Sequence, residues 1–103
     1  MKQPAVYILS SRPNGVLYIG VTSNLIRRVW QHKHKNYPGF TRRYDVTKLV
    51  WYELHSDMRG AISREKAIKK WRRAWKEELI EATNPQWRDR WTDIAEGFPL
   101  SRE

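Results

Sequence analysis

The sequence predicts an α+β fold in which helices pack on a three-stranded antiparallel sheet, in the order ββαβα(α). Two β-prone segments, residues 5–10 and 16–21, flank the turn-forming run Arg12-Pro13-Asn14-Gly15, as in a β-hairpin. A third β-prone segment, residues 46–55, lies between two stretches in which apolar residues recur at helical spacing. Together these three observations predict the fold class.

The hairpin carries two tyrosines whose relative orientation depends on the loop between the strands. Because side chains alternate along a strand, Tyr7 and Tyr18 share a face if the loop holds an even number of residues. An odd loop places them on opposite faces. Two interpretations stay open at this point: ordinary core tyrosines, or a pair of phenols that face one site.

A helix is expected directly after the hairpin. Thr22 and Ser23 can cap a helix that begins near Asn24 and fades by Asn36. Its apolar stripe recurs at helical spacing and comprises Leu25, Ile26, Val29 and Trp30. A helix with one apolar face packs on the sheet through that face.

The second half of the chain predicts a further strand and one or two helices. A basic loop through residues 42–43 leads to the third strand, and Asp57 can cap the helical region that follows. The apolar positions fit one long helix or two helices with a break near residues 73–74. This region ends at Asn84, because the residue before Pro85 disfavours the α conformation.

The length of 103 residues fits one domain, which we expect to span residues 1–96, with 97–103 as a frayed tail. Trp87 and Trp91 are expected to fold back on the core. The absence of cysteine excludes disulfides and cysteine-based zinc sites. Apolar runs of four or five residues are too short for a membrane span, and the N-terminus lacks a signal peptide. We therefore expect a cytoplasmic protein.

The charge balance predicts a polyanionic partner. Lys and Arg outnumber Asp and Glu by 20 to 11, for a net charge of +9, and 13% of the residues are aromatic. Nucleic acid is the expected partner. The residues expected to contact its backbone are Lys33, Lys35, Arg42, Arg43, Lys69, Arg72 and Arg73. Tyr37, Phe40 and Tyr44 interleave the first group and suit base stacking. A merely cationic surface, or a helix on an anionic membrane, are the alternatives.

Two residues of the first predicted helix are candidates for phosphate chemistry. Arg28 and His32 are four residues apart, hence neighbours on the helix surface. A guanidinium can grip a phosphate, and an imidazole can pass a proton. The alternative is a solvated helix face. A three-histidine metal site is disfavoured, because His32 and His34 are two residues apart and diverge in a helix.

Glu65 is the most informative single residue. In a helical projection it lies between Ala61 and Ile68, at the border of the inward face, and its sequence neighbours are basic. A carboxylate near a buried face costs free energy unless it is paired or metal-bound. Glu65 can hold Mg²⁺, which prefers oxygen ligands and keeps several waters. The alternative is an intrahelical ion pair with Lys69, or with Arg64 and Lys66 around it.

The same residues resemble a known family. Ala5-Val6-Tyr7 and Tyr18-Ile19-Gly20 are similar to the two short motifs that name the GIY-YIG nuclease superfamily. Four further residues follow in family order: Arg28, His32, Glu65 and Asn84. The resemblance covers about residues 4–91. It is closest to the small single-domain bacterial members, which resemble the N-terminal nuclease module of the incision enzyme of DNA excision repair.

The resemblance implies metal-dependent hydrolysis of phosphodiester bonds in nucleic acid, which we expect to be DNA. It implies Mg²⁺ or Mn²⁺ on Glu65 and a general base supplied by Tyr7 or Tyr18. Arg28 would stabilise the phosphate charge, and His32 would assist proton transfer or position a water. Asn84 would order the site from the far side.

The sequence departs from the family pattern at two positions. Ala5 replaces the first motif glycine, and Val21 stands where relatives of the repair enzyme often carry lysine. If that lysine helps to lower a tyrosine pKa, the task passes here to Arg28, His32 and the metal. A nucleic-acid-binding module with little or no cleavage activity is the alternative function.

Overall fold

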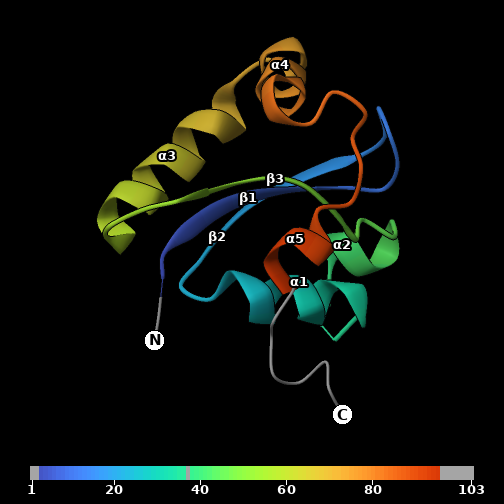
Figure 1. Cartoon of the computed structure of the whole chain (residues 1–103), viewed down its shortest axis with the longest axis horizontal. Helices are drawn as coiled ribbons and strands as arrows, with labels where there is room; N and C mark the ends of the chain where they lie inside the picture. The colour runs from blue at the N-terminus through green and yellow to red at the C-terminus, as the bar shows by residue number, and fades with distance from the viewer. Residues whose placement is uncertain (1–2, 37, 96–103) are drawn as a thin grey trace.

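A computed structural model describes residues 3–36 and 38–95 of the chain. Its centre is a three-stranded antiparallel sheet with the strand order β2-β1-β3. The strands are β1 (Ala5–Ser10), β2 (Leu17–Thr22) and β3 (Lys48–Leu54). The predicted fold class is confirmed, and β2 forms one edge of the sheet (Figure 1).

The hairpin register decides the question of the two tyrosines. Six residues, 11–16, connect β1 to β2, so the loop is even. Tyr7 lies opposite Gly20, and Leu9 lies opposite Tyr18. Tyr7 and Tyr18 therefore share one face of the sheet, with ring centroids 6.3 Å apart.

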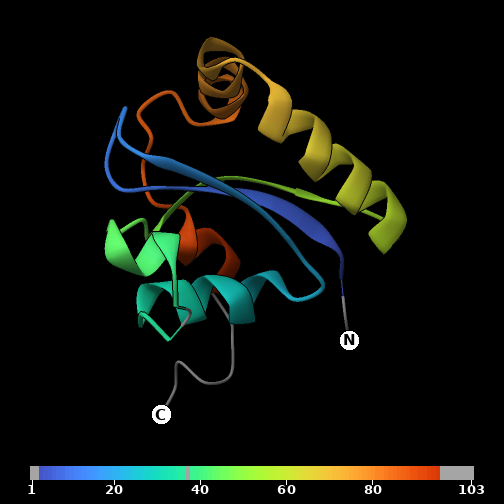
Figure 2. The same cartoon turned by 180° about the vertical axis from the view of Figure 1, so that it is seen from behind.

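Helices cover both faces of the sheet (Figures 1 and 2). On one side lie α1 (Leu25–Lys33), α2 (Phe40–Arg43) and α5 (Trp91–Ala95). On the other side lie α3 (Met58–Lys70) and α4 (Arg73–Thr83). Strand alternation feeds both layers: Tyr7 and Leu9 pack with the α1 side, whereas Val6 and Ile8 pack under α3 and α4.

Most boundaries agree with the sequence to within a few residues. Asn24, rather than Thr22 or Ser23, is the N-cap of α1, and its side chain accepts a hydrogen bond from the backbone N–H of Arg27. The helix ends at Lys33, earlier than expected, and Lys35 then adopts a positive φ of 56°. Asp57 caps α3 as predicted, accepting from the N–H of Gly60.

The prediction of a loop through residues 42–43 is wrong. Residues 40–43 form the short helix α2, closed by hydrogen bonds from Arg43 N to Gly39 O and from Tyr44 N to Phe40 O. The basic and aromatic side chains of this segment are typical of a nucleic-acid-binding loop, which is why the sequence predicts one. Thr41 is its one buried residue, and its side chain anchors the turn on the inner face.

The second helical region is two helices, and the break lies slightly before the predicted position. Trp71 and Arg72 have extended backbone angles and separate α3 from α4. Asn84 is the C-cap of α4, as expected from the proline that follows.

Both tail tryptophans return to the core, as predicted. Trp87 is buried in the cluster under α3 and α4, and Trp91 packs against the cluster under α1. The connecting loop therefore passes around the β3 side of the sheet, from one layer to the other (Figure 1). The predicted frayed tail, 97–103, lies outside the described residues, as does Tyr37. Within residues 3–36 and 38–95, no helix is long and apolar enough to cross a membrane.

Candidate functional site

A chain of hydrogen bonds joins the hairpin to two helices. The Tyr7 hydroxyl lies 3.2 Å from Nε2 of His32, and Nδ1 of His32 lies 2.8 Å from Oγ1 of Thr41. All three side chains are buried. Strand β1, helix α1 and helix α2 each supply one member, so the fold locks the imidazole between a phenol and a hydroxyl. The sequence carries no signal for Thr41.

Tyr18 lies beside this chain and differs from Tyr7 in exposure. Its ring centroid is 5.5 Å from that of His32 and 6.3 Å from that of Tyr7. Tyr7 is fully buried, whereas Tyr18 is half-buried. Of the two phenols, Tyr18 is the one that solvent and a substrate can reach.

The environment of His32 keeps its imidazole neutral. Burial, followed by the positive charge of Arg28, lowers the pKa of His32 from 6.5 to about 4. At neutral pH one ring nitrogen therefore carries a proton and the other accepts a hydrogen bond. Either Tyr7 donates to Nε2 while Nδ1 donates to Thr41, or Thr41 donates to Nδ1 while Nε2 donates to Tyr7.

Gly20 of the second motif makes room for Tyr7. A Cβ placed on Gly20 would lie 2.4 Å from both Cζ and the hydroxyl oxygen of Tyr7. That separation is far inside van der Waals contact, so the glycine lets the phenol lie flat against β2. The position of the Tyr7 hydroxyl thus depends on the absence of a side chain on the neighbouring strand.

A polar hollow lies at the beginning of α1, next to Arg28. Its volume is about 300 Å³. The residues that line it are Thr22, Ser23, Asn24, Arg27, Arg28 and Gln31. Two guanidinium groups at one hollow offer the fork of donors that matches phosphate oxygens. Arg28 therefore lines the hollow and also lowers the pKa of His32.

Glu65 lies in the other layer of the fold. It is buried on the inner face of α3, and its Oε2 is 2.5 Å from Nζ of Lys69. The ion pair that the sequence offered as an alternative is therefore present. Helix α3 packs over β1 and β2, on the side of the sheet opposite to α1 (Figure 2).

The chemistry of this carboxylate fits a divalent cation. A cationic group, the Lys69 ammonium, already stands against Glu65, and the Lys69 side chain is 53% exposed, so it can withdraw. No cluster of three or more potential ligands occurs in the described ranges, 3–36 and 38–95. Magnesium is often held by one or two carboxylates, with waters and substrate phosphate completing its coordination. The single carboxylate of Glu65 is therefore sufficient to hold Mg²⁺ together with waters and a substrate phosphate.

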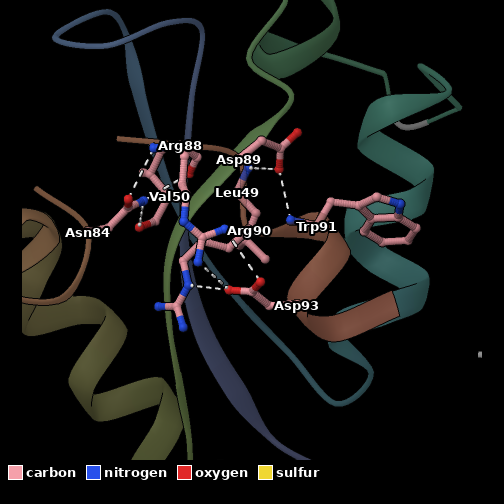
Figure 3. A network of polar contacts seen from close by, with 8 residues as sticks. All are labelled: Leu49, Val50, Asn84, Arg88, Asp89, Arg90, Trp91 and Asp93. Atoms are coloured by element: carbon pink, nitrogen blue, oxygen red, sulfur yellow. Dashed lines mark hydrogen bonds and ion pairs between the residues drawn. The ribbon is translucent and has the colours of Figure 1, made fainter. Parts of the chain in front are cut away.

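Asn84 acts within the loop that wraps the β3 side of the sheet (Figure 3). Its amide nitrogen donates to the carbonyl oxygens of Val50 and Arg88, and its Oδ1 accepts from the N–H of Arg88. Asn84 is buried, and its amide holds the loop against β3. Asn84 therefore lies at the β3 edge of the sheet, which is the edge opposite to β2.

The loop then reaches helix α1 through Asp89, a residue for which the sequence carries no signal. Asp89 accepts hydrogen bonds from the N–H groups of Leu49 and Trp91 (Figure 3). It also forms an ion pair with Lys33. Lys33 also donates to the carbonyl of Thr47. Asn84 is therefore linked to the helix that carries Arg28 and His32 through the backbone and Asp89.

The predicted backbone-binding residues differ in how they are engaged. Besides Lys33, three of them pair within the protein: Lys35 with Asp45, Lys69 with Glu65, and Arg73 with Glu77 and the Gly15 carbonyl. The others lie exposed, namely Arg42, Arg43 and Arg72. The guanidinium of Arg43 lies 5.7 Å from the ring of Tyr44, and that of Arg72 lies 5.0 Å from the ring of Trp75.

Comparison with known proteins assigns the family. Residues 3–78 match the model of the GIY-YIG catalytic domain. The chain belongs to the GIY-YIG family. It is 39% identical over 77 residues to a UPF0213 protein of Clostridium perfringens, covering 75% of this chain and 82% of that one. It is 36% identical over 87 residues to a UPF0213 protein of Syntrophus aciditrophicus, covering 84% of this chain and 98% of the relative.

A solved structure agrees with the fold of this GIY-YIG chain. The solution NMR structure of a UPF0213 protein from Bacillus halodurans superposes with a TM-score of 0.53 at 25% identity. The superposition covers 89% of this chain and 96% of the other. The resemblance to a small GIY-YIG domain is thereby confirmed, and membership implies a nuclease-like activity on nucleic acid.

Proposed function

We propose that this chain is an endonuclease that hydrolyses phosphodiester bonds in DNA with the help of Mg²⁺ or Mn²⁺. The observation that carries the proposal is the buried Tyr7–His32–Thr41 chain beside the half-buried Tyr18. A buried polar chain costs free energy unless every member is satisfied. An arrangement that bonds a neutral imidazole to one phenol and packs it beside a second suits proton transfer better than plain binding.

Tyr18 is the general base in this proposal. The base must reach the attacking water, and Tyr18 is the phenol that is open to solvent. A free phenol has a pKa of about 10, so ionising it at pH 7 costs about 4 kcal/mol. The positive charge of Arg28 lowers the pKa of His32, so a cation stands in the same layer as the Tyr18 ring.

The other residues of the α1 layer orient the reacting groups and neutralise charge on the phosphate. The Tyr18 phenolate takes a proton from water, the water oxygen bonds to phosphorus, and the bond from phosphorus to the leaving oxygen breaks. The leaving oxygen takes up a proton from solvent, and Tyr18 then returns its proton to solvent. The Arg28 guanidinium stabilises the charge on the phosphate oxygens. His32 holds the Tyr7 phenol in place and assists the proton transfer beside Tyr18.

Glu65 would hold the divalent cation, with the ammonium of Lys69 displaced. When bound, the cation supplies Lewis-acid stabilisation of the phosphoryl charge. Because β2 is the sheet edge, a phosphodiester laid along it can meet Tyr18 and Arg28 from one layer and Glu65 from the other. Asn84 acts as a positioning residue through the loop that ties β3 to α1.

Nicking of supercoiled plasmid tests the proposal. The parent should nick in Mg²⁺ or Mn²⁺ and stop in EDTA, and Glu65→Gln should lose the activity. Glu77→Gln is the matched control, because Glu77 also makes an i,i+4 ion pair on a helix of the same layer. Equal nicking by Glu65→Gln and the parent would overturn the role of Glu65.

The alternative, a nucleic-acid-binding module with little cleavage, draws support from the Glu65–Lys69 pair. If Lys69 keeps the carboxylate occupied, the basic surface still binds nucleic acid. In that case the parent binds plasmid but shows no metal-dependent nicking.

A further inference from the structure

Two exposed aromatic rings continue outward from Tyr18. The Phe40 ring stacks on that of Tyr18, with centroids 6.4 Å apart and planes inclined by 25°. The Tyr44 ring lies 4.9 Å from that of Phe40. Phe40 is 45% exposed and Tyr44 is 48% exposed. We refer to Phe40 and Tyr44 together as the aromatic ledge.

Helix α2 divides its residues between the interior and this ledge. Thr41 points inward and bonds to His32, while Phe40 and Tyr44 lie at the two ends of the same turn and face solvent. The turn therefore positions the ledge relative to Tyr18 through the same residue that positions the imidazole.

The charges around the ledge are positive. Arg42 and Arg43 lie exposed on the same turn, and the Arg43 guanidinium lies 5.7 Å from the Tyr44 ring. The neighbouring acid, Asp45, is paired with Lys35, which also lowers the pKa of Asp45. Rings flanked by guanidinium groups suit a ligand that combines a flat π-system with phosphate charge.

We propose that the aromatic ledge stacks an unpaired nucleobase next to the phosphate that is cut beside Tyr18. Bases inside a duplex already stack on their neighbours and offer no face to a protein ring. An unpaired or extruded base offers one, and its stacking on an aromatic side chain contributes about 1–3 kcal/mol. The ledge thus selects single-stranded or locally unpaired nucleic acid. This inference rests on the proposed function, because the phosphate beside Tyr18 is cut only if the chain is an endonuclease. Binding of the base itself does not require cleavage.

Binding of a single-stranded oligonucleotide that contains 2-aminopurine, in EDTA, tests the ledge without cleavage. Stacking on the ledge should quench the fluorophore in the parent. Phe40→Leu/Tyr44→Leu should lose the quenching and on the order of tenfold to hundredfold in affinity for the single strand. Trp75→Leu is the matched control: Trp75 is 47% exposed and lies on α4, in the other layer, so its loss should change neither quantity.

A second variant separates stacking from folding. Phe40→Tyr/Tyr44→Phe keeps both rings and should retain quenching and affinity. Unchanged affinity and quenching in the leucine variant would overturn the inference. So would a change from dimer to monomer in the leucine variant with single-strand binding intact, because the ledge would then be a protein contact. Ledge-dependent binding in a parent that never nicks plasmid would support the ledge and refute the proposed endonuclease.

Discussion

The hydroxyl of Tyr7 lies 3.2 Å from Nε2 of His32, and both side chains are closed off from solvent. The phenol comes from the central strand β1 and the imidazole from α1, 25 residues later. Removing either partner leaves a buried polar atom without this bond. The contact therefore links the stability of the fold to the geometry of the candidate site.

The two tyrosines should differ when each is changed to phenylalanine. Tyr18→Phe should lower the single-turnover cleavage rate by about 10²–10⁴-fold, the usual contribution of a general base, with little change in Tm. Tyr7→Phe removes the partner of His32 and should cost about 1–3 kcal/mol of unfolding free energy. Rate and denaturant unfolding, measured on both variants, check this. A large rate loss for Tyr7→Phe and none for Tyr18→Phe would reverse the assignment.

The stability of the fold should decrease as the pH is lowered from about 6.5 to about 4, because of His32. The pKa of His32 is about 4 in the folded chain and near 6.5 when unfolded. As pH falls below 6.5, the unfolded chain binds the proton first, so the folded state loses its advantage. Tm of the parent should drop more steeply from pH 7 to pH 4.5 than Tm of His32→Gln. His34→Gln, which changes an exposed histidine of the same segment, should keep the parent slope. Identical slopes in parent and His32→Gln would contradict the shift.

Much of the fold follows from patterns that act locally. The turn formers at residues 12–15, the Asp57 cap and the proline after Asn84 act on their immediate neighbours, and each predicted the nearby element. Helix α2 was missed because its anchor, Thr41, depends on His32, a contact between segments. Asp89 was missed for the same reason, since its partners lie on α1 and β3. Which site residues lie together could be seen only in the three-dimensional structure. Tyr7, Tyr18, Arg28 and His32 share one layer, while Glu65 lies in the other.

Gly20→Ala should disable the site through sterics alone. The new Cβ would stand 2.4 Å from the Tyr7 hydroxyl, so the phenol must move away from His32. We expect a loss of cleavage of about tenfold or more and a destabilisation of about 1–3 kcal/mol, as for overpacking in a core. Cleavage rate and Tm check both. Ala5→Gly, on the central strand, is the control and should retain the rate, because it removes a methyl group and overpacks nothing.

Asn84→Ala should destabilise the loop on the β3 side of the sheet. It removes three hydrogen bonds and leaves the buried carbonyl of Val50 without its donor. The expected cost is about 1–3 kcal/mol, and each kcal/mol lowers Tm by about 4–8 °C in a domain of this size. Thermal unfolding checks the prediction, with the exposed Gln86→Ala in the same loop as control. Equal Tm values for the two variants would mean that the Asn84 side-chain amide does not stabilise the loop.

The central claim is that Tyr18 and Glu65, from opposite layers, serve one metal-dependent site at the β2 edge. Single-turnover nicking in Mn²⁺ by the parent, Tyr18→Phe, Glu65→Gln and the double variant tests it most directly. Residues that act as a unit are not additive, so the double variant should be about as slow as the slower single variant. A parent that does not nick, or losses that multiply in the double variant, would contradict a shared site.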